Sequence, residues 1–102
     1  MSIKKEYQKK GNMCKVTFSL PKEAVKSAKS VHIVGEFNNW SITATPMKKQ
    51  KNGTFAFSLN LEKGKEYQFR YLIDGTIWEN DWNADKYVPT PFGSYDNSIV
   101  VV

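Results

Sequence analysis

Three tryptophans and a single arginine are the side chains whose types and positions point most directly to ligand chemistry. Trp40 follows two asparagines in the segment FNNWS, just after a short apolar stretch, where a ring is difficult to bury completely. Trp78 and Trp82 lie in a polar stretch, residues 74–97, whose length is typical of functional loops. Any one ring could instead plug an open end of the fold. We nevertheless expect at least one ring face to be open to a ligand.

A sugar chain is the ligand that suits this inventory. The C–H groups of a pyranose form an apolar face that stacks on indole, whereas its hydroxyls need donors and acceptors at the ring edge. Strand alternation places Arg70 on the face away from the core, where an arginine is usually a solvated charge unless the tryptophans share that face. The sequence predicts stacking on exposed tryptophans, with hydroxyls bonded by donors and acceptors such as Asn38, Asn39, Arg70 and Asn97. Two stacks and a few neutral hydrogen bonds predict a dissociation constant of roughly 10 μM to 1 mM.

Nucleic acid is the contrasting ligand, because bases also stack on aromatic rings. Phosphate binding additionally needs a row of lysines or arginines among those rings. The aromatic-rich segment, residues 74–97, instead carries one lysine and five carboxylates: Asp74, Glu79, Asp81, Asp85 and Asp96. We therefore expect no nucleic-acid partner.

Catalytic and metal chemistry find little support in the sequence. Glu79 and Asp81 would project to the same side of an extended segment, as a glycosidase pair could, but such acidic pairs are usually only solvated. His32 has no evident serine or cysteine partner and is expected to be a packed strand residue. Cys14, the only cysteine, is expected to be a small buried apolar side chain. We expect no catalytic residue, metal or cofactor.

The length and charge of the chain indicate one small domain with a basic lead-in. The chain has 102 residues, of which 40% are hydrophobic. Its net charge is +5, but the first ten residues hold four lysines against one glutamate, which leaves +2 for the rest. We expect residues 1–12 to be a solvated, frayed tail and residues 13–102 to form the domain. No apolar run approaches the roughly 18 residues of a membrane span, and no signal peptide is evident, so a cytoplasmic location without membrane contact is predicted.

The elements that must position these residues are strands. Apolar and polar residues alternate along residues 13–20 and 54–61, and Asn52–Gly53 before the second segment predicts a hairpin. In residues 66–74 the alternation sends Tyr67, Phe69, Tyr71 and Ile73 inward, and Gln68, Arg70 and Leu72 outward. About seven short strands predict an all-β, immunoglobulin-like antiparallel sandwich. An open barrel of the oligonucleotide-binding type is the alternative.

Three segments, taken in order and spacing, carry a family resemblance: VHIVGEFNNW, GTFAFSLNLEKGKEYQFRYLIDG and FGSYDNSIVVV. From about Val31 to Val102 the chain resembles the early-set family of glycogen- and starch-binding modules, carbohydrate-binding module family 48. That family occurs at the N-terminus of isoamylases and branching enzymes and within the beta subunit of AMP-activated protein kinase. The chain is most similar to short bacterial proteins that consist of an isoamylase-type early-set domain alone.

The resemblance implies an immunoglobulin-like sandwich and a site that grips an α-1,4-glucan. It assigns Trp40 to the first stacking ring and Trp78 to the second, and it puts Arg70 where the kinase modules have a lysine. Phe92 takes the place of a leucine that braces the sugar. The asparagine that bonds a sugar hydroxyl falls at Asp96 or Asn97, depending on the register.

The chain also departs from the family pattern. Ile77 adds a residue before the second ring, and Trp82, which has no counterpart in the kinase modules, is either core or site. The catalytic barrel that follows this module in isoamylases needs 200 residues or more, so the chain is expected not to be an enzyme. The predicted function is α-glucan binding, with a glucan-metabolising enzyme or another protein as a further partner. The alternative is a protein-interaction domain that uses the same aromatic patch without binding sugar.

Overall fold

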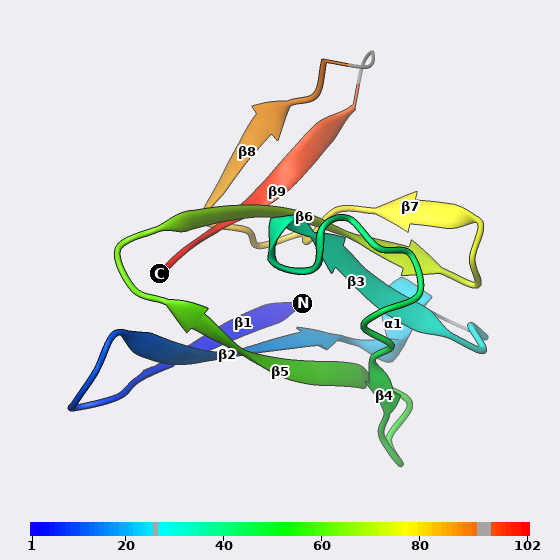
Figure 1. Ribbon diagram of the computed structural model, residues 1–102. Coiled ribbons are helices and arrows are strands. Elements are labelled where there is room, and N and C mark those ends of the chain that lie inside the picture. The colour runs from blue at the N-terminus through cyan, green and yellow to red at the C-terminus, as the bar shows by residue number, and fades with distance from the viewer. Residues whose placement is uncertain (26, 92–94) are drawn as a thin grey trace.

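The computed structural model describes residues 1–25, 27–91 and 95–102, and shows two antiparallel sheets packed face to face (Figure 1). The first sheet has the order β1 (Ser2–Tyr7), β2 (Met13–Leu20), β5 (Phe55–Glu62) and β4 (Lys48–Lys49). The second has the order β3 (Val31–Gly35), β6 (Glu66–Ile73), β9 (Asp96–Val101) and β8 (Lys86–Pro89), with β7 (Ile77–Glu79) also paired to β6. A four-residue helix, α1 (Lys22–Val25), and a 3₁₀ turn, η1 (Glu36–Asn38), complete the fold. The predicted sandwich is confirmed, and in the described segments no helix is long and apolar enough to cross a membrane.

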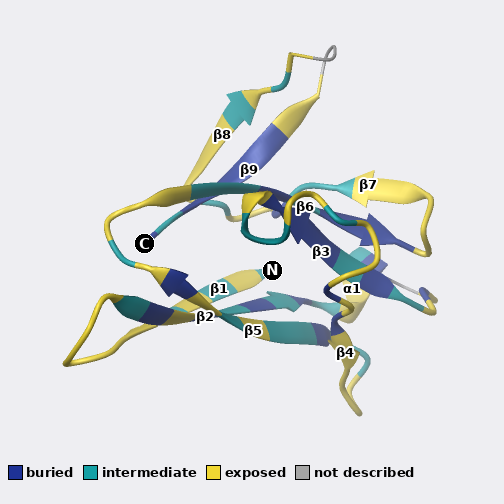
Figure 2. Ribbon diagram, in the orientation of Figure 1, coloured by how far each residue is buried: buried dark blue, intermediate teal, exposed yellow. Residues whose placement is uncertain are grey.

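The core lies between the two sheets, on the faces that alternation predicted (Figure 2). The inward residues of β2 are fully buried: Cys14, Val16, Phe18 and Leu20. Phe18 meets Phe69 of the opposite sheet edge-on, with ring centroids 5.1 Å apart. Burial of a side chain of this size is worth about 1.5–3 kcal/mol, so the two sheets hold each other in place. The predicted burial of Cys14 is confirmed.

Strand β6 is shared between two partners along one edge, and this divides the second sheet. Its first half pairs with β9, from Glu66 opposite Val101 to Phe69 opposite Ser98. Its second half pairs with β7, from Tyr71 to Ile73. The hairpin of β8 and β9 rises at an angle from the rest of the second sheet, while β7 continues along β6 (Figure 1). We call this divergence of β9 and β7 the fork, and Arg70 is the β6 residue that lies at it.

A buried polar network fills the inner side of the fork. The Tyr71 hydroxyl donates to Asp81 Oδ2 at 2.7 Å, and the Asp81 backbone N–H donates to Ser98 Oγ at 2.9 Å. Burial, followed by the charge of Asp81 and the hydrogen bond to it, raises the pKa of the Tyr71 hydroxyl well above its ordinary value, so it remains a donor. The expectation that Glu79 and Asp81 project to one side as a solvated pair is wrong. Strand β7 ends at Glu79, and Asp81 turns inward to 0% exposure.

The first residues of the chain form an edge strand, so the predicted solvated tail is wrong for Ser2–Tyr7. Strand β1 pairs with β2 from Ser2 opposite Ser19 to Tyr7 opposite Cys14. Its Ile3 packs against the core, and Lys5 Nζ reaches Asp85 Oδ2 at 2.7 Å. Strand β8, in the stretch predicted to be a long polar loop, is the second unexpected strand.

The turn between β6 and β7 is built on Asp74 and Gly75, which both have positive φ angles, 51° and 69°. Asp74 Oδ1 accepts hydrogen bonds from the backbone N–H groups of Lys29, at 2.7 Å, and Ser30, at 3.0 Å. These two bonds, that of Ser30 first, lower the pKa of the Asp74 carboxyl below its ordinary value. The turn is thereby fastened to the segment that leads into β3.

The lowered pKa of Asp74 predicts that part of the free energy of unfolding is lost in acid. Because the folded-state pKa lies below the unfolded value of about 3.8, its stabilisation is complete above that pH and is lost as the pH falls through the folded pKa. Asp74→Asn tolerates the positive φ angle but cannot titrate. Urea unfolding of both proteins between pH 7 and pH 3 should show a stability difference that narrows below about pH 4. A difference that stays constant with pH would contradict this assignment.

Candidate functional site

The loop that carries Trp40 is shaped by the amide of Asn38. Asn38 Oδ1 accepts from the Gly35 N–H at 3.1 Å, and its Nδ2 donates to Ile33 O at 2.9 Å and Thr45 Oγ1 at 3.0 Å. Both amide N–H groups are therefore used within the fold. The Asn38 amide therefore stabilises the shape of the loop, and both of its N–H groups are already bonded within the protein.

Two successive residues with positive φ angles then lift the ring outward. Asn39 has a φ of 56° and Trp40 a φ of 58°. The Trp40 N–H donates to Gly35 O at 2.8 Å, which closes the loop. Asn39 is exposed, and Trp40 keeps 39% of its surface accessible. The aromatic ring predicted to be open to solvent is open.

The same loop is tied to β6, which fixes Trp40 relative to the strand. Glu36 Oε1 accepts from the backbone N–H of Gln68 at 2.6 Å. Gly35 approaches β6 so closely that an added Cβ would lie 2.5 Å from Gln68 O. Only glycine permits this approach, and it brings Trp40 beside the outer face of β6.

Arg70 lies on that outer face, at the fork, between two aromatic rings. Its guanidinium carbon is 5.4 Å from the ring centroid of Trp78 and 5.4 Å from that of Tyr95. Trp78 comes from β7 and Tyr95 immediately precedes β9, so each prong of the fork supplies one ring. Each such contact is worth about 0.5–1 kcal/mol at an exposed site. Both rings pack against the guanidinium, whose N–H groups are the only charged donors that the described lining offers a ligand.

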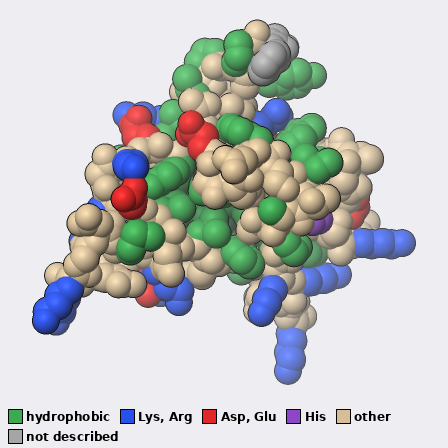
Figure 3. All heavy atoms as spheres, viewed as in Figure 1, with side chains coloured by type: hydrophobic (Ala, Val, Ile, Leu, Met, Phe, Trp, Pro, Cys, Tyr) green, Lys and Arg blue, Asp and Glu red, His purple; other side chains and the backbone are tan. Residues whose placement is uncertain are grey.

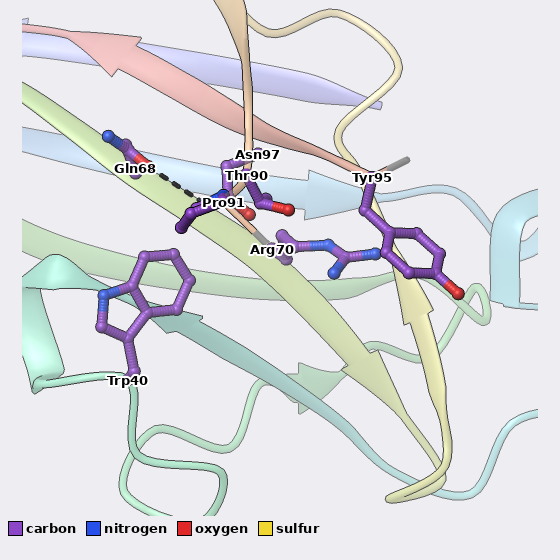
Figure 4. A pocket seen from close by; sticks show the side chains of 7 residues that line it. All are labelled: Trp40, Gln68, Arg70, Thr90, Pro91, Tyr95 and Asn97. Atoms are coloured by element: carbon purple, nitrogen blue, oxygen red, sulfur yellow. Dashed lines mark hydrogen bonds between the residues drawn. The ribbon is translucent and has the colours of Figure 1, made fainter. Parts of the chain in front are cut away.

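A pocket of about 370 Å³ opens beside this arginine (Figure 4). Figure 4 shows Trp40 at one side and Tyr95 at the other, with Arg70 between them. Asn97 Nδ2 donates to Gln68 Oε1 at 3.0 Å, which leaves the Gln68 amide nitrogen and the Asn97 amide oxygen for a ligand. The lining is completed by Thr90 and Pro91: Trp40, Gln68, Arg70, Thr90, Pro91, Tyr95 and Asn97. Amides, one cation and two rings therefore converge on a single pocket.

The pocket gathers some of the predicted site residues and not others. Trp40, Arg70 and Asn97 line it. Trp78 packs against Arg70 but is not among the described residues that line the pocket. Asp96 has the opposite parity on β9 from Asn97 and so faces away from it. Trp82 is 52% exposed and is not among the described lining residues, and its backbone N–H donates to Met1 Sδ. Phe92 lies outside the described residues.

Four lining residues were not among the candidates from sequence: Gln68, Thr90, Pro91 and Tyr95. Gln68 is two residues from Arg70, so the alternation that placed Arg70 outward could have identified it. Thr90 and Pro91 follow β8 and Tyr95 precedes β9, and nothing in the spacing of the sequence indicated that this hairpin would reach Arg70. Two buried atoms here, Arg70 Nε and Thr90 Oγ1, have no hydrogen-bond partner in the described part of the chain.

The charge around the pocket suits a neutral ligand. Of the described lining residues, only Arg70 is charged. Lysine side chains instead protrude from the layer that contains β1, β2, β5 and β4, as Figure 3 shows below the body of the molecule. A phosphate backbone would need several cations beside the rings. The described lining of this pocket offers one cation, Arg70.

The fold and the pocket define a class: a small immunoglobulin-like sandwich that exposes aromatic rings and amides on one sheet face. A family model described as the glycogen recognition site of AMP-activated protein kinase matches residues 22–102, and the chain belongs to this family. The family resemblance seen in the sequence is confirmed.

Curated relatives carry the same segment within longer chains. The chain is 36% identical over 77 residues to protein PTST homolog 2, chloroplastic, of Arabidopsis thaliana, covering 74% of this chain and 13% of that protein. It is 37% identical over 76 residues to the human 5'-AMP-activated protein kinase subunit beta-2, covering 74% of this chain and 26% of the subunit. The mouse beta-2 subunit matches equally. The chain thus spans 13% of one relative and 26% of the other, and what they share with it is this module.

Proposed function

We propose that this protein is a non-catalytic module that binds α-1,4-glucans of the glycogen and starch type. The pocket walled by Trp40 and Tyr95, with Arg70, Gln68 and Asn97 between them, carries the proposal. Membership of a glycogen-recognition family supports the same ligand. Asp81, one member of the acidic pair considered for catalysis, is buried in a hydrogen-bond network, which supports a binding role.

The chemistry of binding follows from the two kinds of surface in the pocket. An indole face covered by a sugar ring removes on the order of 100 Å² of apolar surface from water, worth roughly 2–3 kcal/mol. The amides and the guanidinium edge bond the hydroxyls, at about 1 kcal/mol net for each neutral bond. A dissociation constant of roughly 10 μM to 1 mM results, and a polymer with many sites raises the apparent affinity.

Affinity electrophoresis tests the proposal. The wild type should be retarded in native gels cast with glycogen and not in gels cast with dextran, and the retardation should barely change with salt because the ligand is neutral. Trp40→Ala should weaken binding by at least about tenfold through the loss of the stacking face. Trp82→Ala is the matched control, since it removes an exposed tryptophan outside the pocket.

Two results would contradict glucan binding. Unchanged mobility of the wild type at high glycogen would remove the sugar as ligand and would favour a protein partner for the same aromatic patch. Equal losses in Trp40→Ala and Trp82→Ala would show that retardation does not report on this pocket.

A further inference from the structure

The position of Trp78 relative to the pocket differs from what a second stacking ring requires. Arg70 lies over the Trp78 ring, and among the described residues Trp78 does not contribute to the pocket lining. Tyr95 does line the pocket and is the more exposed ring, at 61% against 41% for Trp78. Arg70 is equally close to both rings, so the pocket lining and the exposure are what distinguish Tyr95 from Trp78.

The backbone around Tyr95 explains why its ring reaches the pocket. The Thr90 N–H donates to Tyr95 O at 2.9 Å, which closes the β8–β9 hairpin beside the fork. Tyr95 and Asn97 are two residues apart, so their side chains leave the strand on the same side. Asn97 is anchored to Gln68, and Tyr95 lies on the side of the pocket away from Trp40 (Figure 4).

We propose that Tyr95 is the second aromatic residue that contacts the glucan, opposite Trp40, and that Trp78 is a positioning residue that acts through Arg70. The inference rests on the proposed glucan-binding function. Tyr95 offers an apolar ring face and a hydroxyl at its edge, and both match a sugar ring bounded by hydroxyls. Trp78 packs against the guanidinium and restricts the positions that its N–H groups can take beside the pocket.

The two roles differ in how they depend on Arg70. A ring that contacts sugar contributes to affinity whether or not the arginine is present. A ring that only positions the arginine contributes nothing once the arginine is removed. A double-mutant cycle with Arg70→Ala therefore separates them.

The experiment is an NMR titration of ¹⁵N-labelled protein with maltoheptaose, which reports weak affinities and confirms folding of each variant in the same spectra. Tyr95→Ala and Trp78→Ala are each measured alone and combined with Arg70→Ala. Tyr95→Phe keeps the ring and is the conservative variant, and Trp82→Ala is the control outside the pocket.

We expect Tyr95→Ala to weaken binding by about tenfold in the wild-type background and still to weaken it severalfold in the Arg70→Ala background, and Tyr95→Phe to retain most of the affinity. Trp78→Ala should weaken binding in the wild-type background and change it by less than about twofold in the Arg70→Ala background. If Trp78→Ala costs the same in both backgrounds, or if Tyr95→Ala leaves affinity unchanged while the wild type binds, this inference is overturned and the proposed function survives. If the wild type binds no maltoheptaose and no glycogen, both fall together.

Discussion

Replacing Asp81 with alanine is expected to lower the free energy of unfolding by roughly 2–5 kcal/mol, because the change leaves donors of a buried hydrogen-bond network without an acceptor. Asp81 Oδ2 accepts from the Tyr71 hydroxyl and Oδ1 accepts from the Asn83 N–H at 2.8 Å. Both donors lose their partner in the variant, and Tyr71 lies fully buried in the core. The loss is a large part of the 5–15 kcal/mol that a domain usually has.

Urea unfolding followed by tryptophan fluorescence measures this change. Asp96→Ala is the matched control. Asp96 is exposed, and its backbone carbonyl accepts a hydrogen bond from Asn80 Nδ2, which alanine preserves. Tyr71→Phe tests the same bond from its other end and should also destabilise, since the carboxylate loses a donor. A cost for Asp81→Ala no larger than for Asp96→Ala would show that the network does not brace the fork.

Gly35→Ala is expected to cost about 3 kcal/mol of stability through overpacking alone. An added Cβ would lie 2.5 Å from Gln68 O and 2.8 Å from Phe69 Cβ, both parts of the central strand. The φ angle of Gly35 is −168°, extended backbone that alanine adopts without strain. The cost is therefore a matter of space, and relieving it must move the loop away from β6.

The same substitution should weaken glucan binding, because the Trp40 N–H is bonded to Gly35 O. Thermal or urea unfolding and gel retardation on glycogen measure the two effects. Gly11→Ala is the control for backbone strain without a steric clash. The φ angle of Gly11 is +84° and an added Cβ meets nothing within 4 Å. We therefore expect this variant to lose about 1–2 kcal/mol of stability and to keep its glycogen binding. A Gly35→Ala protein as stable as Gly11→Ala would contradict the close approach.

The strands could be predicted wherever one face is continuously apolar, and were missed where it is not. The period of two along β2 places every second side chain in the core, and the structure agrees. On β1 the inward positions include Lys5, a charged residue whose partner, Asp85, is far away in the chain. The alternation of apolar and polar residues that identifies a strand is therefore interrupted in β1. Leu72 does lie on the predicted outer face, but it is buried there, opposite Trp78, because that face carries packing of its own.

The site was predictable only as far as it depends on local sequence. Alternation and the exposed ring led to Arg70 and Trp40, which both line the pocket. Tyr95 reaches it through the path of the β8–β9 hairpin, which depends on pairing across the fork and not on spacing. Asn38 shows a further limit: an amide that shapes a loop and an amide that bonds a ligand have the same sequence signature, and only its three hydrogen bonds distinguish them.

Trp40 holds its ring outward from a backbone with a φ of 58°, a conformation that costs a bulky residue on the order of 1–2 kcal/mol. Glycine at this position would relieve that strain, but it would also lose the contacts of a side chain that is only 39% exposed. The strain is therefore a cost of presenting an aromatic ring at this point of the loop. Libraries built on this scaffold should hold Trp40 fixed while other positions are selected for thermal tolerance.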